Sequence, residues 1–290
     1  MHSMINKPER QLTINPVVAS ELPNPSVHRI HDSRRTLMRT ILLVLVGVTA
    51  LTMPSLIPHG LNLWAAFGNF AENLKIMFVT PRTGNDTWQV LWVALAQSIS
   101  LAFLTTVIGS IVAFFFALMG SHKLSPSWLV YTVQSVMAFI RAIPTILWVL
   151  IYSVALGLGA NAAVIGLTFH SVAYLTKVYA DSIDDLSGDS LSSLSAIGVG
   201  FWPIVTQAVI PETMPNLLSW TFIRFEINFT NAVAVGAAAG AGGIGYQLYM
   251  ASGFYFDFHE VGLIVYMLLL FAVILEIISY MLRNKVIKQH

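Results

Sequence analysis

The sequence predicts an all-α integral membrane protein with six transmembrane helices. Hydrophobic residues make up 56% of the 290 residues and charged residues only 10%, whereas soluble domains carry about 25% charged residues. The hydrophobic residues are gathered into six runs, each about as long as, or longer than, the roughly 20 residues that cross a hydrocarbon core of about 30 Å. Composition and run length together favour a membrane protein over a soluble one.

Composition also excludes several classes of function. A formal net charge of +1 leaves no basic surface for nucleic acid. The chain has no cysteine, so it forms no disulfide and offers no thiolate. It contains no G-x-x-x-x-G-K-[ST] phosphate loop, no H-E-x-x-H zinc motif and no recognisable Ser-His-Asp arrangement. We therefore expect no enzymatic activity, no metal site and no cofactor in the chain itself.

The amino-terminal part is expected to contain a tail, one span and an interfacial segment. Residues 1–39 are polar, contain four prolines and lack a signal-peptide pattern, which favours a flexible cytoplasmic tail. The first span covers residues 40–57. Residues 58–87 mix aromatic and charged side chains, as is typical of a helix or loop at the external membrane interface.

The other five spans form the region 88–282, which a cytoplasmic tail follows at 283–290. Their predicted bounds are residues 88–119, 128–156, 162–179, 212–238 and 260–282. The second of these five is interrupted at Arg141 and Pro144. Basic residues before the first span, at Lys123 in a turn and after the last span fall on one side of the membrane under six-span alternation. The positive-inside rule makes that side the cytoplasm, so both termini are predicted there.

The loop at residues 181–211, which is polar over residues 181–200, is then cytoplasmic. Apolar residues recur in it at spacings of three to five, the pattern of a short amphipathic helix: Leu186, Leu191, Leu194 and Ile197. Such a helix on the membrane face would suit docking to a cytoplasmic partner. The alternative is a solvated connection packed on the helix ends, and spacing alone favours neither.

Charged residues lie deep within the predicted spans, where each costs about 2.5–3.5 kcal/mol to insert. Arg224 shares a helix face with Asn228 and Asn231, at spacings of four and three. That row of donors either suits an anion or holds the bundle together, and the sequence leaves both readings open. For Glu226 a structural ion pair with a neighbouring helix is favoured, because an anion path does not suit a bare carboxylate.

Two further polar residues interrupt apolar runs. Arg141 precedes Pro144, which frees a carbonyl in the preceding turn, so the guanidinium either satisfies groups exposed by that kink or lines a path. His170 is favoured as a hydrogen-bonded core residue over a ligand.

The glycine cluster Gly240-Ala-Gly242-Gly243-Ile-Gly245 matches G-x-G-x-x-G in letters. A dinucleotide fingerprint must follow a strand and open a helix, whereas this cluster ends a membrane helix. The four glycines instead predict close helix approach or a broken backbone that lines a cavity.

The segment at residues 192–211 resembles the cytoplasmic coupling loop of ABC-importer permeases, which reads E-A-A-x-x-x-G, nine residues, then I-x-L-P. Gly198 stands at the glycine and Ile210-Pro211 at the end of the pattern. Further on, Arg224-Phe-Glu-Ile-Asn228 and the glycine cluster resemble the phosphonate-type branch of these permeases. This resemblance implies a five-helix core of the MetI-like fold, to which the first span is an addition.

The resemblance implies a permease subunit of an ATP-driven importer of phosphonate or a related small phosphorus oxyanion, in the plasma or inner membrane. Two permeases, identical or paralogous, would form the path, with two cytoplasmic ATPases that bind ATP-Mg and an external binding protein. It also implies a path lining at Arg141, Arg224, Asn228 and Asn231, and an external gate at the four glycines. The residues implied in coupling to the ATPase are Asp185, Asp189, Ser192, Ser193, Leu194, Gly198 and Pro211.

The chain departs from the family pattern at two places. Ser192-Ser-Leu194 replaces the Glu-Ala-Ala triplet, so a charge from this loop to the ATPase must come from Asp185 or Asp189. Thr230 stands where the branch usually has a basic residue, which makes the expected path less positive. A changed substrate, or pairing with a second and more typical permease, would account for both departures.

Three alternatives stay open. A permease for another small solute would keep the fold and the coupling loop. A membrane scaffold or sensor would lack an ATPase partner. A channel is the least favoured, because it needs no coupling loop.

Overall fold

The structure, a computed structural model, describes residues 33–56, 60, 62–187, 194 and 196–287. This part of the chain is helical, with turns and two short π-helical stretches, and contains no strand. The chain divides into two compact units, Met1–Leu63 and Trp64–His290.

The first unit contains helix α1 (Ser33–Leu56). Its side chains are exposed over residues 34–55, and it is long and apolar enough to cross a membrane. It begins before the predicted start at residue 40, so that Arg34, Arg35 and Arg39 belong to its first turns. Long basic side chains can reach from a helix end to the headgroup region, and the cytoplasmic start of this helix stays a prediction.

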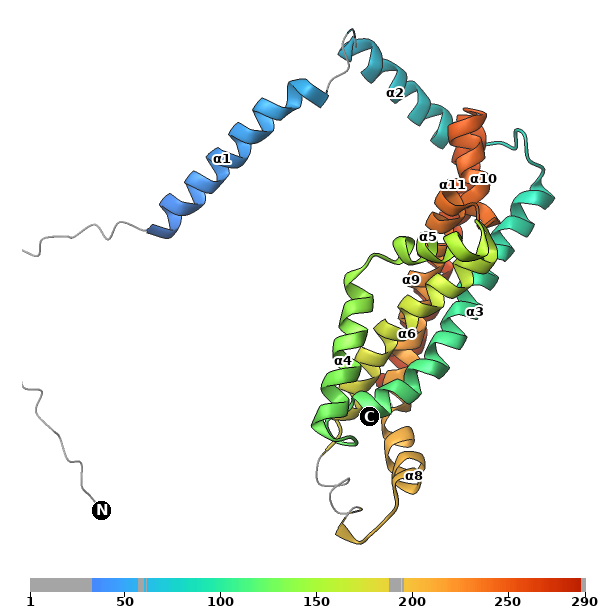
Figure 1. Ribbon diagram of the computed structural model, residues 1–290. Coiled ribbons are helices and arrows are strands. Elements are labelled where there is room, and N and C mark those ends of the chain that lie inside the picture. The colour runs from blue at the N-terminus through green and yellow to red at the C-terminus, as the bar shows by residue number, and fades with distance from the viewer. Residues whose placement is uncertain (1–32, 57–59, 61, 188–193, 195, 288–290) are drawn as a thin grey trace, which may run out of the picture. The chain divides into compact units, whose positions relative to one another are not determined.

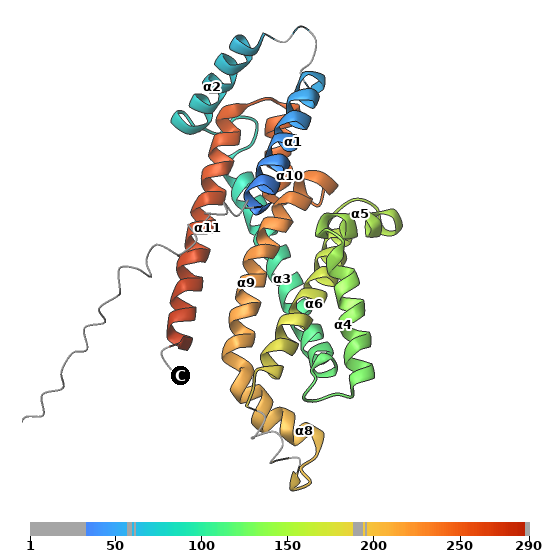
Figure 2. The same ribbon diagram turned by 90° about the vertical axis from the view of Figure 1, so that its left-hand side faces the viewer.

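The second unit is a helical bundle with α3 (Trp88–Gly120), α6 (Ala160–Asp184) and α9 (Ile210–Ala239) at its centre. Figure 2 shows these three helices side by side, with α4 (Ser127–Ala142) next to α6 and α11 (Phe258–Ile287) next to α9. The remaining helices are α2 (Leu63–Val79), α5 (Thr145–Leu156), α8 (Phe201–Ile204) and α10 (Gly243–Tyr249).

Three described helices, α1, α3 and α11, are long and apolar enough to cross a membrane, and five spans result if each of two bent helix pairs counts as one. The sequence predicts six, and the predicted span that does not meet this criterion is residues 162–179, within α6. This helix is less apolar because it carries His170, Lys177 and Asp181. It packs against α3, α4, α5 and α9, and polar residues are tolerated where a helix faces the interior of a bundle.

The predicted span at residues 128–156 is not one helix. It is divided into α4 and α5, which meet at a bend of 89°. Ile143 is extended (φ −94°, ψ 127°), as expected for a residue before proline, and Pro144 caps the start of α5. Figure 1 shows α5 running across the end of α4. The proline therefore ends one helix and starts another, where the sequence suggested only a kink.

A tryptophan compensates for the proline at this bend. Pro144 has no N–H to donate to the carbonyl of Ile140, four residues earlier. The indole Nε1 of Trp148 donates to that carbonyl at 2.9 Å instead. The hypothesis that Arg141 satisfies the groups freed by Pro144 is therefore wrong for this carbonyl.

We expect Trp148→Phe to lower the free energy of unfolding by about 1–3 kcal/mol, because the buried carbonyl of Ile140 loses its donor. The thermal unfolding midpoint of the purified protein in detergent measures this change. Tyr152→Phe is the control, since it alters the same ring cluster without touching the bend. A Trp148→Phe protein as stable as the wild type would contradict the role given to this bond.

The coupling segment runs into the bundle without a loop. α8, a π-helical turn at Val205–Val209 and α9 form one helix, Phe201–Ala239. The sequence placed residues 201–209 in a loop before a span at 212–238, whereas in the structure they are the first turns of the helix. Pro211 cannot donate to the carbonyl of Gln207, and π turns occur where the hydrogen-bond ladder of a helix is interrupted. Pro211 thus changes the hydrogen-bond pattern of the helix and does not end it.

Candidate functional site

A buried polar cluster lies between α6 and α9. Arg224 is only 1% exposed. Its Nε donates to the hydroxyl of Ser171 at 3.1 Å, and its Nη2 lies 3.1 Å from Nδ1 of His170. Its guanidinium carbon is 5.1 Å from the centre of the Tyr174 ring, a cation–π contact. Because a guanidinium can only donate, Nδ1 of His170 is the acceptor, and the prediction that His170 is a hydrogen-bonded core residue is confirmed.

Asn228 extends the cluster to α3. It lies one turn beyond Arg224 and is fully buried. Its Nδ2 donates to the hydroxyl of Thr106 at 2.8 Å and is 3.4 Å from that of Thr105. The same nitrogen is 2.9 Å from the Ser171 hydroxyl. Side-chain hydrogen bonds therefore tie α9 to both α3 and α6 at this depth.

Arg224 contacts no carboxylate in the part of the chain that the structure describes. The groups around it are a hydroxyl, an imidazole and a phenol ring. An ion buried without a counter-ion is costly, so the cluster carries an unbalanced positive charge. These contacts agree in part with both interpretations of the sequence, the structural one and the anion path. The Arg224 side chain links α9 to α6, and its positive charge is not neutralised by any described carboxylate. A role for Arg224 in lining a translocation path requires that a solute reach its guanidinium, and this role stays a prediction.

The other intramembrane candidates lie outside this cluster. Asn231 is half-buried on α9, and Arg141 is half-buried in the last turn of α4. Thr230 is exposed. Glu226 is half-buried and lines a groove of about 430 Å³ between α9 and α11. It forms no ion pair with any described residue, so the structural pairing expected for it stays a prediction.

The predicted coupling residues are described only in part. Asp189, Ser192 and Ser193 lie outside the described residues. Asp185 is exposed at the end of α6. Gly198 is exposed with φ +79°, a left-handed conformation that strains any side chain.

The amphipathic pattern of this segment is likewise incomplete. Leu186 and Leu194 pack against an apolar cluster of α3, α6 and the long helix, whereas Leu191 lies outside the described residues. Ile197 is 76% exposed, and the aromatic pair Phe201-Trp202 is also exposed, with ring centres 5.4 Å apart. An exposed apolar group at this end suits contact with a partner.

Sequence reasoning missed the side chains that anchor the start of the coupling segment. Ser121, in the turn between α3 and α4, is fully buried and donates to Oδ1 of Asp184 at 2.5 Å. The backbone N–H of Lys123 donates to the same oxygen at 3.3 Å, and its ammonium donates to the carbonyl of Leu186. From the sequence, Lys123 was recognised only as a positive charge that indicates membrane orientation. Its partners Leu186 and Asp184 could not be identified, because they lie 63 and 61 residues away along the chain.

The glycine cluster breaks the long helix. Gly240 adopts a left-handed conformation (φ 60°, ψ 30°), α10 begins at Gly243, and the two helices are bent by 46°. The cluster thus ends α9, and its broken backbone is one of the two arrangements that the sequence predicted. Close approach is also present: a Cβ on Gly245 would lie 1.8 Å from the carbonyl oxygen of Val233. A gating role for these glycines stays a prediction.

We expect Gly245→Ala to prevent α10 from packing on α9, because backbone cannot move aside as a flexible side chain can. Gly68→Ala on α2 is the matched control, since nothing lies within 4 Å of a Cβ there. The measurement is the yield of monodisperse protein after extraction in detergent. A Gly245→Ala protein extracted as well as the control would contradict the close contact.

Sequence reasoning also missed a buried carboxylate, that of Glu260, which lies near the start of α3. Glu260 is fully buried at the start of α11, and its carboxylate accepts the N–H groups of Asn85 at 2.8 Å and Asp86 at 3.1 Å. Nδ1 of His259 lies 2.7 Å from the carbonyl of Thr80. Residues 80–87, expected in a loose interfacial segment, are therefore held against α11. The sequence showed Glu260 only as the boundary of a span.

The family of this chain follows from a match over most of its core. A protein-family model described as the binding-protein-dependent transport system inner membrane component matches residues 109–288. The chain belongs to this family. It is therefore an inner membrane component with several helices that are long and apolar enough to cross a membrane.

The chain is similar to permeases whose names refer to phosphorus compounds. It is 26% identical over 198 residues to the phosphate-import permease protein PhnE of Mycolicibacterium smegmatis, covering 68% of this chain and 37% of that one. It is 29% identical over 191 residues to the phosphite transport system permease protein PtxC of Stutzerimonas stutzeri, covering 66% and 67%. The chain thus spans about a third of the mycobacterial relative.

Solved structures show the same fold. The permease superimposes on an inward-facing MetNI methionine ABC transporter with a TM-score of 0.63 at 18% identity, covering 70% of this chain and 99% of that one. A bacterial alginate ABC transporter gives a TM-score of 0.60 at 14% identity, covering 86% and 99%. The MetI-like core expected from the sequence is therefore confirmed.

Proposed function

We propose that this permease forms the translocation path for a small phosphorus oxyanion, such as phosphonate, phosphite or phosphate. The observation that carries this proposal is Arg224, a buried cation that no described carboxylate neutralises. The names of its relatives support the same class of solute, since several are permeases for phosphate or phosphite.

The chemistry of the cluster suits such a solute. Guanidinium groups bind phosphorus oxyanions through paired hydrogen bonds. A fixed positive charge also lowers the cost of moving an anion through a medium of low dielectric constant. The hydroxyls of Thr105, Thr106 and Ser171 accept from Nδ2 of Asn228 and hold its amide in place one turn from Arg224. Because Thr230 is not basic, Arg224 supplies the positive charge of this path on α9.

The assembly that we propose contains two such permeases, as a homodimer or with a paralogue. Each chain crosses the membrane six times, α6 being the span that the other helices shield, and both termini are cytoplasmic. Two ATPases bind ATP-Mg and contact the segment around Gly198, and an external binding protein delivers the solute. The continuous helix Phe201–Ala239 would carry movement from that contact to Arg224.

Reconstitution tests the solute class. The permease, its ATPases and its binding protein are placed in proteoliposomes, and ATP-driven uptake of labelled phosphite, phosphate and methylphosphonate is compared with that of methionine. We expect uptake of at least one oxyanion and competition among them. Uptake of methionine alone would favour a different solute, in line with a 22% identical relative named as a probable D-methionine transport permease. Absence of an ATPase from the purified complex would favour a scaffold or sensor.

A further inference from the structure

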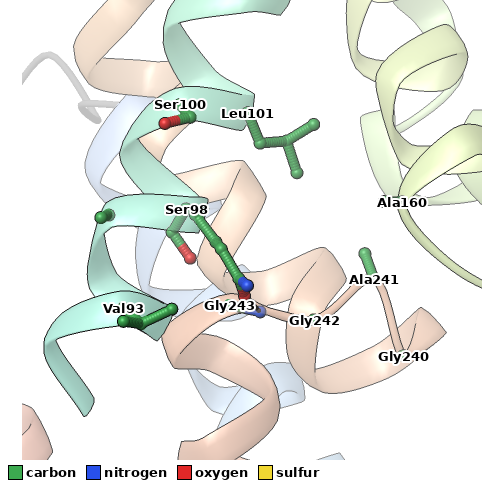
Figure 3. Close-up of a pocket in the computed structure, with 11 residues that line it drawn as sticks. Val93, Ser98, Ser100, Leu101, Ala160, Gly240, Ala241, Gly242 and Gly243 are labelled. Atoms are coloured by element: carbon green, nitrogen blue, oxygen red, sulfur yellow. Dashed lines mark hydrogen bonds between the residues drawn. The ribbon is translucent and has the colours of Figure 1, made fainter. Parts of the chain in front are cut away.

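A cavity of about 690 Å³ lies beside the break in the long helix. Figure 3 shows it bounded by α3, by the break at Gly240–Gly243 and by Ala160 at the start of α6. None of the residues of the Arg224 cluster lines it. It is therefore a separate feature, formed by different residues of α3 and by the backbone of the break.

The α3 wall of this cavity contains three polar residues among apolar ones. α3 has a mean hydropathy of 2.4 over its most apolar window, yet Gln97, Ser98 and Ser100 line the cavity. Gln97 and Ser100 are exposed on the surface of the protomer. A lipid-facing helix does not favour exposed amide and hydroxyl groups, so this wall is suited to a watery space between protomers.

Two of these side chains are fixed by the break itself. Oε1 of Gln97 accepts the N–H of Gly243 at 3.3 Å, and Oγ of Ser98 accepts the N–H of Ile244 at 3.1 Å. The first N–H groups of α10 are therefore already occupied and are not offered to a ligand. Since the amide oxygen of Gln97 is held by Gly243, its Nε2 is left with two hydrogens to donate.

The backbone of the break adopts conformations that favour glycine. Gly240, Gly242 and Gly243 have φ values of 60°, 79° and 73°, a region that residues with side chains rarely adopt. Irregular backbone at membrane depth is tolerated where it lines a water-filled cavity, and broken helices contribute to solute sites in transporters. Gln97 itself lies about 14 Å along α3 from Trp88, at a rise of 1.5 Å per residue.

We propose that this cavity is a second contact site for the transported oxyanion, in which the solute accepts hydrogen bonds from Nε2 of Gln97 and the hydroxyl of Ser100. This inference rests on the proposed function, because it takes the solute class from it. The site carries no charge, so it binds the anion through neutral donors and releases it more readily than the buried Arg224 would. Conduction needs such weak, successive sites.

The test is Gln97→Glu in the reconstituted importer. Glutamate keeps an oxygen that accepts the N–H of Gly243 and replaces the donating Nε2 with a negatively charged oxygen. We expect uptake of the oxyanion to fall by about tenfold or more, because like charges placed together are strongly unfavourable, while the ATPases still copurify. Gln247→Glu is the matched control, since Gln247 lies on α10 and does not line the cavity.

Ser100→Asp is the second variant, because it adds a carboxylate to the same wall without altering the bond between Gln97 and Gly243. Wild-type uptake by an assembled Gln97→Glu or Ser100→Asp complex would overturn the proposed site. If neither variant assembled, the wall would be needed for folding and the proposal would also fail. A wild-type complex that imports no oxyanion would reject the proposed function itself, and is distinguished by having no uptake before any substitution.

Discussion

Arg224→Ala is expected to lower ATP-driven oxyanion uptake by about tenfold or more, which corresponds to roughly 1.4 kcal/mol of lost stabilisation of the solute in the path. The substitution removes a positive charge that no described carboxylate balances. Transport is measured in proteoliposomes, and copurification of the ATPases shows whether the complex still assembles. Asn228→Ala is expected to act in the same direction, because it removes the amide that links the cluster to α3.

Arg224→Lys is the control for charge alone. Lysine keeps the cation but cannot make the forked contacts to Ser171 and His170, so an intermediate rate is expected. Normal uptake by an assembled Arg224→Ala complex would reject the path role. Loss of assembly in both Arg224 variants would assign the side chain to holding α6 and α9 together.

Gly198→Arg is expected to abolish solute-stimulated ATP hydrolysis or binding of the ATPase. Gly198 has φ +79°, and a side chain there costs of order 1–3 kcal/mol of backbone strain. A long cation at this exposed position would also obstruct a partner surface. Hydrolysis by the reconstituted complex, with and without loaded binding protein, measures the effect.

Gly200→Arg provides the matched control for Gly198→Arg. It adds the same side chain two residues away, at the cap of α8, where φ is −68° and no left-handed strain arises. We expect Gly200→Arg to retain more coupling than Gly198→Arg. Full coupling in the Gly198→Arg complex would reject this segment as the ATPase contact.

Local patterns predicted much of the helical structure. The start of α3 at Trp88 and the turn around Lys123 follow directly from apolar runs and their polar limits. The prolines were harder to interpret. Pro144 ends a helix and turns the chain by 89°, whereas Pro211 lies within a continuous helix. Both lack an N–H, and only the surrounding contacts decide whether the chain bends or a π turn absorbs the defect.

The sequence predicted the residues of the candidate site better than it predicted the partners that they contact. Arg224 and Asn228 stood out because polar groups in an apolar run need a reason. Their partners on α6 and α3 did not, because Ser171 lies 53 residues from Arg224, and Thr106 lies 122 residues from Asn228. Serine and threonine are common in membrane helices and give no signal of their own.

The sequence by itself predicted an all-α membrane protein with a polar segment before a charged helix and a glycine cluster after it, and its resemblance to importer permeases predicted the family. Those features depend on composition and on spacing along one chain, which a sequence displays directly. The tertiary structure alone decided that Arg224 is buried without a described counter-ion, that Trp148 repairs the bend at Pro144, and that Gln97 faces a cavity at the broken helix. These depend on contacts between helices, whose packing is set by side-chain shape and by which groups find a hydrogen-bond partner.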